Sequence, residues 1–184
     1  SKQIHFTVES PVSAYWRTGA YDAYTGSGWD SDPDPQPYDG SIAPADDTGQ
    51  RVSYRVTLET SATGLPTVWR PHTVSLSDAM VTDADAVRSE RTLSAGTQYN
   101  GTSYVPPDDP TLLRTSGRDY PDSVDDQYTD LSETGDERLS TFTDDLTADS
   151  DSPYETATTI EQWLETNKTY SLDPGQEPGD NVAS

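Results

Sequence analysis

The nine residues RVSYRVTLE, Arg51–Glu59, alternate strictly between polar and apolar side chains. The apolar members all share one phase of the alternation: Val52, Tyr54, Val56 and Leu58. Because successive side chains of a strand point to opposite faces of a sheet, this pattern predicts a β-strand with one buried face. A sheet buried on one face needs a second layer to cover it, so this segment favours a layered β fold.

Further extended segments surround this strand. Lys2–Glu9 alternates in the same way, with Ile4, Phe6 and Val8 expected on the inner face. Shorter extended pieces are expected at Thr67–Trp69, Thr73–Leu76, Ala79–Thr82 and Thr97–Val105, separated by Gly, Pro, Asp and Ser. Asp30–Gln50 has no periodicity and is expected to be a surface loop. We therefore predict an antiparallel β-sandwich over residues 1–106, with an immunoglobulin-like arrangement as one option.

The pattern changes after this point. We expect a linker over 107–131 and a helical segment over 132–184. Thr134 and Glu137 have the spacing of a capping box, and Ser152, Pro153 and Glu155 mark a second helix start. Apolar residues then recur at helical spacing behind each start: Leu139, Phe142 and Leu146 in the first helix, and Ala157, Ile160, Trp163 and Leu164 in the second. The predicted fold class is mainly β, with two C-terminal amphipathic helices.

The charge of the chain limits its environment and partners. The formal net charge is −22, and two Lys stand against nine Arg. Acidic side chains repel one another over about 10 Å in dilute buffer, but over only about 3 Å in 1 M salt. This composition is typical of salt-loving organisms, and we expect a halophilic archaeal source. The same charge argues against nucleic acid as a partner.

Several classes of site are excluded or unsupported. There is no Cys, so this chain has no disulfide and no thiol chemistry. His5 is expected in solvent and His72 on an inner face, and neither is expected to be catalytic. Asp30, Asp32 and Asp34 resemble a calcium array, but Pro35 stands where an EF-hand loop requires Gly. We predict no catalytic residue, no cofactor and no metal site, and leave open whether these aspartates hold a cation.

The aromatic stretch YWRTGAYDAYTGSGW, Tyr15–Trp29, is the strongest candidate for a binding site. Tyr24 and Trp29 flank the loop TGSG, whose glycines favour a hairpin with these two residues opposite one another. Our preferred interpretation is that the aromatic residues fill the core of a sandwich poor in aliphatic side chains. The alternative is a stacking surface for sugar rings or peptide, formed by Tyr21, Tyr24 and Trp29.

Four stretches, taken together, resemble a known family. They are YWRTGAYDAYTGSGW, LPTVWRPHTV (Leu65–Val74), YETATTIEQWLETN (Tyr154–Asn167), and TYSLDP with GDNVAS (Thr169–Ser184). In this order and spacing they resemble the region upstream of the catalytic core in membrane-anchored, transglutaminase-like proteins of bacteria and archaea, which are often described as cysteine proteases. The resemblance extends over the whole chain.

The resemblance implies the following. The chain would be extracytoplasmic, with membrane helices before it and a papain-like transglutaminase core after it. Those parts of the same polypeptide would be its partners, and the segment itself would not insert into the membrane. The nucleophilic Cys, with His and Asp, would lie beyond Ser184, and the start at Ser1 without Met fits an excised piece. No catalytic residue is carried over to this chain.

We therefore expect a non-catalytic extracytoplasmic accessory domain, tethered to the cell membrane in the intact protein. Its expected role is to hold the catalytic core away from the membrane and to shape access to it. The rival interpretation is a free-standing module that binds glycan or a cell-wall polymer through the aromatic hairpin. The two differ in the exposure of Tyr21, Tyr24 and Trp29.

Overall fold

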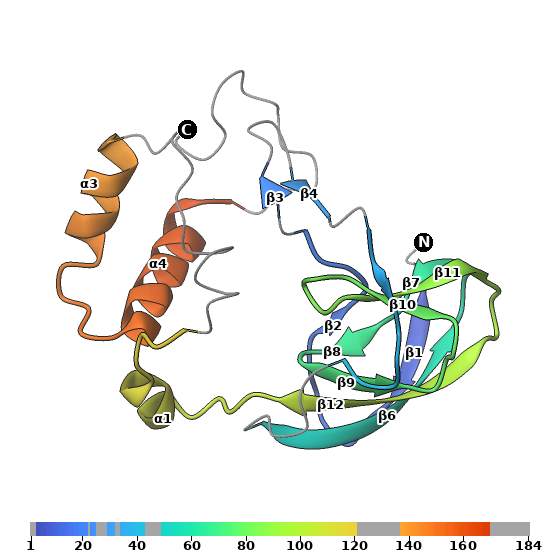
Figure 1. Cartoon of the computed structure of the whole chain (residues 1–184). Helices are drawn as coiled ribbons and strands as arrows, with labels where there is room; N and C mark the ends of the chain where they lie inside the picture. The colour runs from blue at the N-terminus through green and yellow to red at the C-terminus, as the bar shows by residue number, and fades with distance from the viewer. Residues whose placement is uncertain are drawn as a thin grey trace. The chain divides into compact units, whose positions relative to one another are not determined.

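A computed structural model describes residues 3–21, 23–24, 29–31, 34–42, 49–120 and 137–169 of the chain. The chain divides into two compact units, Ser1–Pro107 and Asp108–Ser184. The first unit carries all the described strands and the second carries the described helices, as Figure 1 shows.

The larger sheet of the first unit is antiparallel and four-stranded, in the order β1-β6-β12-β9. Its strands are β1 (Phe6–Glu9), β6 (Gln50–Leu58), β12 (Gln98–Val105) and β9 (Pro71–Val74). β6 and β12 form its centre and pair continuously from Gln98 opposite Thr57 to Val105 opposite Gln50. Buried and more exposed residues largely alternate along both central strands, as expected for a sheet with one face on the core.

A second four-stranded sheet has the order β5-β10-β11-β7. Its strands are β5 (Gln36–Pro37), β10 (Ala79–Val81), β11 (Val87–Leu93) and β7 (Ala62–Gly64). Two short pairs complete the β structure: β2 (Trp16–Arg17) with β8 (Thr67–Val68), and β3 (Ala23–Tyr24) with β4 (Trp29–Asp30). The predicted class, mainly antiparallel β with C-terminal helices and sandwich-like layers, is confirmed.

The core lies on the face that the alternation in Arg51–Glu59 predicts. Val52, Tyr54, Val56 and Leu58 are all buried, with Val56 fully enclosed. Tyr99 of β12 joins them, and its hydroxyl donates to the carbonyl of Pro66 over 2.6 Å. Burial raises the pKa of Tyr54 and of Tyr99 above the ordinary value for a phenol, with the larger shift at Tyr99, so both hydroxyls stay protonated at neutral pH.

A glycine makes room for one of these rings. Gly101 of β12 lies opposite Tyr54 in the ladder, and a Cβ placed on Gly101 would meet Cζ of Tyr54 at 2.5 Å. The Tyr54 hydroxyl lies 3.2 Å from Oγ of Ser103, and that Oγ donates to the carbonyl of Val68. The Tyr54 ring therefore passes directly over the backbone of its neighbouring strand, where only glycine fits.

Three strand-level expectations need correction. Ile4 was expected inside but is 64% exposed, because β1 begins only at Phe6. Part of the expected loop Asp30–Gln50 pairs with the sheet as β5, and Tyr38 packs against the core. β11 was not foreseen, because Ser89 occupies a buried position and breaks its apolar alternation.

The second unit contains α1 (Pro110–Thr115), α3 (Glu137–Leu146) and α4 (Pro153–Asn167). The start of α4 is confirmed: Ser152 is the N-cap, and its hydroxyl accepts from the Glu155 amide. The Glu155 carboxylate accepts in turn from the amide of Asp151. The helix α1 lies in the range expected as a linker, and Thr134 of the other capping box lies outside the described residues. Within the described part of the chain, no helix is long and apolar enough to span a membrane.

Candidate functional site

The aromatic hairpin forms with the predicted pairing. β3 and β4 are antiparallel, and Tyr24 stands opposite Trp29. The register is the one that a four-residue loop between them requires. The loop itself and the side chain of Tyr24 lie outside the described residues.

The preferred interpretation of these aromatic residues as core is wrong for most of them. Tyr15 is 99% exposed, Tyr21 71% and Trp29 63%. Among the described aromatic side chains of this stretch, Trp16 alone packs against the core, with its ring perpendicular to that of Tyr54 at 4.8 Å between centroids. The physical reason is that Tyr54, Tyr99 and the aliphatic residues of β6 and its neighbours fill the space between the sheets. The aromatic ribbon, defined here as Tyr15, Tyr21 and Trp29, faces solvent in this chain.

A second aromatic group was not singled out from the sequence. Trp69 is 44% exposed, and the guanidinium carbon of Arg17 lies 4.2 Å from its ring centroid. Nη2 of Arg17 donates to the carbonyl of Ala84, and Nε of Arg70 donates to Asp85 over 2.9 Å. The signal was present as the dipeptide Trp-Arg, which occurs at Trp16 and again at Trp69. Arg17 already stacks on the Trp69 ring, so Trp69 offers a ligand less open ring surface than Trp29 does.

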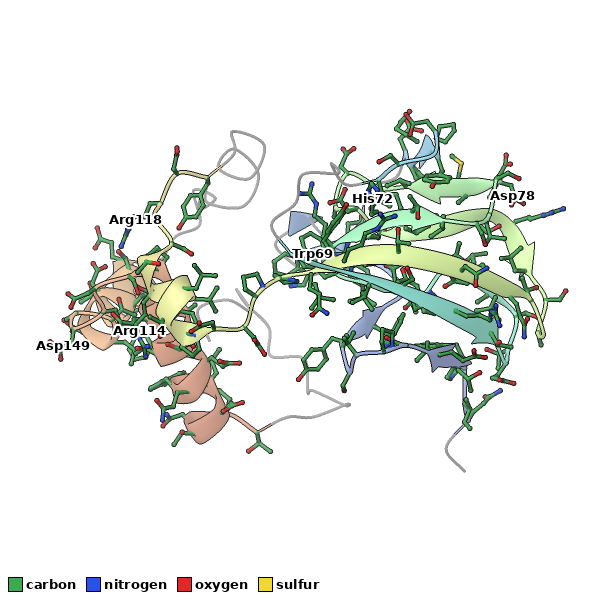
Figure 2. All side chains as sticks on the ribbon, turned by 90° about the horizontal axis from the view of Figure 1, so that it is seen from below. Trp69, His72, Asp78, Arg114, Arg118 and Asp149 are labelled. Atoms are coloured by element: carbon green, nitrogen blue, oxygen red, sulfur yellow. The ribbon has the colours of Figure 1, made fainter. Side chains whose placement is uncertain are left out.

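The structure describes the surroundings of both histidines. His5 is exposed, as expected, and its Nδ1 lies 3.4 Å from Oγ1 of Thr60. His72 is half-buried, and its ring lies 5.2 Å from that of Tyr104, centroid to centroid. Trp69 and His72 both lie on the β-rich unit, as Figure 2 shows. His72 therefore packs against the ring of Tyr104, and His5 lies in solvent.

The aspartate array is only partly described by the structure. Asp32 lies outside the described residues, so the array of Asp30, Asp32 and Asp34 cannot be assembled from them. Among the residues whose placement is described, no group of three or more His, Asp or Glu side chains has the geometry to hold a metal ion.

Comparison with known proteins places the chain. The crystal structure of the periplasmic domain of TgpA from Pseudomonas aeruginosa matches with a TM-score of 0.66 and 16% identity. The same domain bound to ethylmercury matches with a TM-score of 0.62 and 15% identity. All of this chain is covered in both, but it spans only 63% and 64% of those domains. A search of curated protein sequences gives no match.

At these identities the structural likeness establishes the fold. The family is established by sequence, because a model described as the TgpA N-terminal domain matches residues 1–110, which is more than half of the chain. This match includes the whole β-rich unit and the aromatic ribbon. The chain therefore belongs to the TgpA N-terminal domain family.

Proposed function

We propose that this chain is a non-catalytic, extracytoplasmic accessory domain that precedes the catalytic core of a membrane-tethered transglutaminase-like protein. The family match over residues 1–110 carries the proposal. The fold likeness supports it, because the TgpA domain of the matching crystal structure is periplasmic. The chain also has no Cys with which to attack an acyl group.

The catalytic core of the intact protein would correspond to the part of the TgpA domain that has no counterpart in this chain. Such a core would transfer acyl groups or hydrolyse amides through a thiolate that a His activates. The accessory domain would hold that core away from the membrane and limit which substrates reach it.

The helices offer a surface for such a core. No described residue of α3 or α4 is buried. Phe142 and Trp163 contact each other with ring centroids 5.0 Å apart, yet Phe142 is 41% exposed and Leu164 is 46% exposed. An apolar helical face that remains this open is typical of a surface covered by another element. We place the downstream core on this helical face, defined as Phe142, Trp163 and Leu164.

Amide hydrogen exchange tests this placement. The 184-residue chain would be compared with a polypeptide extended through the following region of the same protein. We expect amides of α4 to exchange about tenfold or more slowly in the extended polypeptide. Leu164→Ser should reduce that protection, whereas Glu165→Gln, an exposed neighbour on the same helix, should not. Equal exchange of α4 in both polypeptides would contradict the proposal.

The aromatic ribbon favours a second candidate function, the binding of glycan or a cell-wall polymer. Its support is the exposure of Tyr21 and Trp29, which a stacking surface requires. The proposed binding residues are Tyr21 and Trp29 of the ribbon together with Tyr24, the strand partner of Trp29. Exposed aromatic rings stack on the apolar faces of sugars, and their burial provides much of the binding free energy.

Titration of the chain with soluble peptidoglycan fragments and with cello-oligosaccharides, followed by Trp fluorescence, tests this candidate. Trp29→Ala should abolish binding without lowering the midpoint of thermal unfolding, since Trp29 is 63% exposed. Trp69→Ala is the matched control, because it removes another partly exposed Trp outside the ribbon. Loss of binding in both variants alike, or no binding by the wild type, would rule the ribbon out as the site.

We also propose a halophilic archaeal source, with the net charge of −22 as support. If the surface is adapted to brine, the free energy of unfolding should rise between 0.1 M and 2 M KCl, because screening weakens the repulsion between carboxylates. Stability that is unchanged by KCl over this range would contradict the proposal.

A further inference from the structure

The strand β1 forms one edge of the larger sheet. Among the strands that the structure describes, β1 pairs with β6 alone, with Phe6 opposite Leu58 and Val8 opposite Val56. The amide of Leu58 donates to Thr97, on the β12 side, and the amide of Glu59 donates to His5 of the β1 side. Backbone groups of a strand alternate between its two sides. The N–H and C=O groups of Phe6 and Val8 therefore point away from β6, toward the open edge.

Within the described residues, no backbone hydrogen bond from another segment reaches these groups of Phe6 or Val8. Ile4, which precedes β1, has the same phase as Phe6 and Val8 and is 64% exposed. It adds an apolar side chain in line with theirs. An open edge of this kind is a template for a further strand.

A cavity of about 460 Å³ lies at the start of β1, where His5 and Phe6 line it. Phe6, Leu58, Ala62 and Pro66 give it apolar surfaces, and the polar side chains of His5 and Thr60 line it as well. Gly64 also lines the cavity, and close approach of the Thr18 carbonyl forbids any side chain there. The volume falls within the range of roughly 300–1,000 Å³ typical of ligand sites.

Backbone groups two residues apart that have no partner within the described residues, near a cavity lined by both apolar and polar side chains, are the two parts of a site for an extended peptide. The backbone groups pair with the peptide main chain, and the cavity takes one of its side chains. Charge then defines the peptide. Glu9 is exposed at one end of β1, where its carboxylate lies 3.8 Å from Nη1 of Arg55. Glu59, which accepts a hydrogen bond from Thr7, lies near the other end. The unit that carries β1, residues 1–107, has 13 acidic side chains against 7 basic ones.

We propose that the open edge of β1 binds an extended cationic peptide by strand addition, with an apolar side chain of the peptide in the adjoining cavity. The occupant is a separate polypeptide. A second copy of this chain is disfavoured, because it would bring two surfaces of the same acidic charge together. This site goes beyond the proposed accessory role and needs no downstream core.

The test uses the 184-residue chain and a blocked peptide of sequence KTLTK at low salt. The apolar-to-polar control peptide is KTNTK, and the charge control is ETLTE. NMR titration should shift the amides of Phe6 and Val8, and those of residues around Ala62. We expect KTLTK to bind about tenfold more tightly than either control. Shifts confined to other parts of the chain, or equal binding of all three peptides, would overturn the proposal.

Two variants test the two parts of the site. Val8→Pro removes the outward N–H of the edge while leaving the pairing with β6 intact, and edge strands tolerate Pro in this position. Ala62→Leu fills the cavity without changing the backbone. Both variants should weaken KTLTK binding about tenfold, with circular dichroism showing that the fold is retained. Val105→Ala, a half-buried position on β12 away from the edge, should bind as the wild type does.

Unchanged binding in Ala62→Leu would overturn the role of the cavity even if Val8→Pro unfolds. Analytical ultracentrifugation provides the remaining check. A chain that dimerises through Phe6 and Val8, and loses its dimer in Val8→Pro, would show that the edge serves a second copy and would overturn the proposal.

Discussion

Replacing Gly101 with Ala tests the packing of the core at its tightest point. A Cβ at this position would lie 2.5 Å from Cζ and 2.6 Å from the hydroxyl oxygen of Tyr54, so the ring has to move. Tyr54 is only 4% exposed, which leaves it no open space to move into. The substitution therefore has to strain the core, shift the backbone or expel the ring.

The cost can be estimated from what the ring now contacts. Overpacking of a core costs about 1–3 kcal/mol. Displacing Tyr54 also weakens its perpendicular contact with Trp16, worth about 0.5–1.5 kcal/mol, and its hydrogen bond to Ser103, worth about 1 kcal/mol. We expect Gly101→Ala to lower the free energy of unfolding by about 2–5 kcal/mol.

Urea unfolding followed by circular dichroism measures the effect. Gly19→Ala is the matched control, because nothing lies within 4 Å of its added Cβ, and it should change stability by less than about 0.5 kcal/mol. In a Tyr54→Leu background the cost of Gly101→Ala should shrink, because the clashing ring is gone. A loss below about 0.5 kcal/mol for Gly101→Ala in the wild-type background would show that the Tyr54 ring does not exclude a side chain at this position.

Three further predictions concern buried polar groups and a helix cap. Thr67 is fully buried, and its Oγ1 has no hydrogen-bond partner within the described part of the chain, so Thr67→Val should raise the free energy of unfolding by about 1 kcal/mol in urea titrations. Burial raises the pKa of Tyr54 and Tyr99, so above about pH 10 the unfolded chain loses these protons while the folded chain keeps them. The free energy of unfolding should therefore be constant below that pH and fall above it by up to about 1.4 kcal/mol per pH unit for each phenol. Urea unfolding at stepped alkaline pH measures this fall. Ser152→Ala removes the cap of α4 and should cost about 1 kcal/mol, seen as faster amide exchange in its first turn.

The parts of the fold that are visible in the sequence are those with a strong local pattern. Residues 51–58 alternate strictly and form β6, and Ser152 with Pro153 defines the start of α4. β11 escaped because Ser89 replaces an apolar residue at a buried position. β5 escaped because its two residues, Gln36 and Pro37, gain their structure only from pairing with β10. Patterns within a segment predict an element, but pairing between distant segments does not appear in them.

The candidate site shows the same division. The pairing of Tyr24 with Trp29 follows from the loop between them, and the structure has it. The exposure of a side chain does not follow from local sequence, because it depends on which other residues of the fold fill the core. Tyr54 and Tyr99 lie on long central strands and are buried in the core, whereas Trp29 lies on a two-residue strand and is exposed. The open edge of β1 likewise depends on the order of strands in the sheet, which no segment of the sequence reveals.

The measurement that tests the central claim most directly is the sequence of the parent gene on both sides of residues 1–184. The account predicts membrane-spanning segments before Ser1, and a Cys soon after Ser184 with His and Asp beyond it. A stop codon directly after Ser184, with a secretion signal upstream, would contradict the accessory-domain proposal. The aromatic ribbon would then become the leading candidate for the function of the chain.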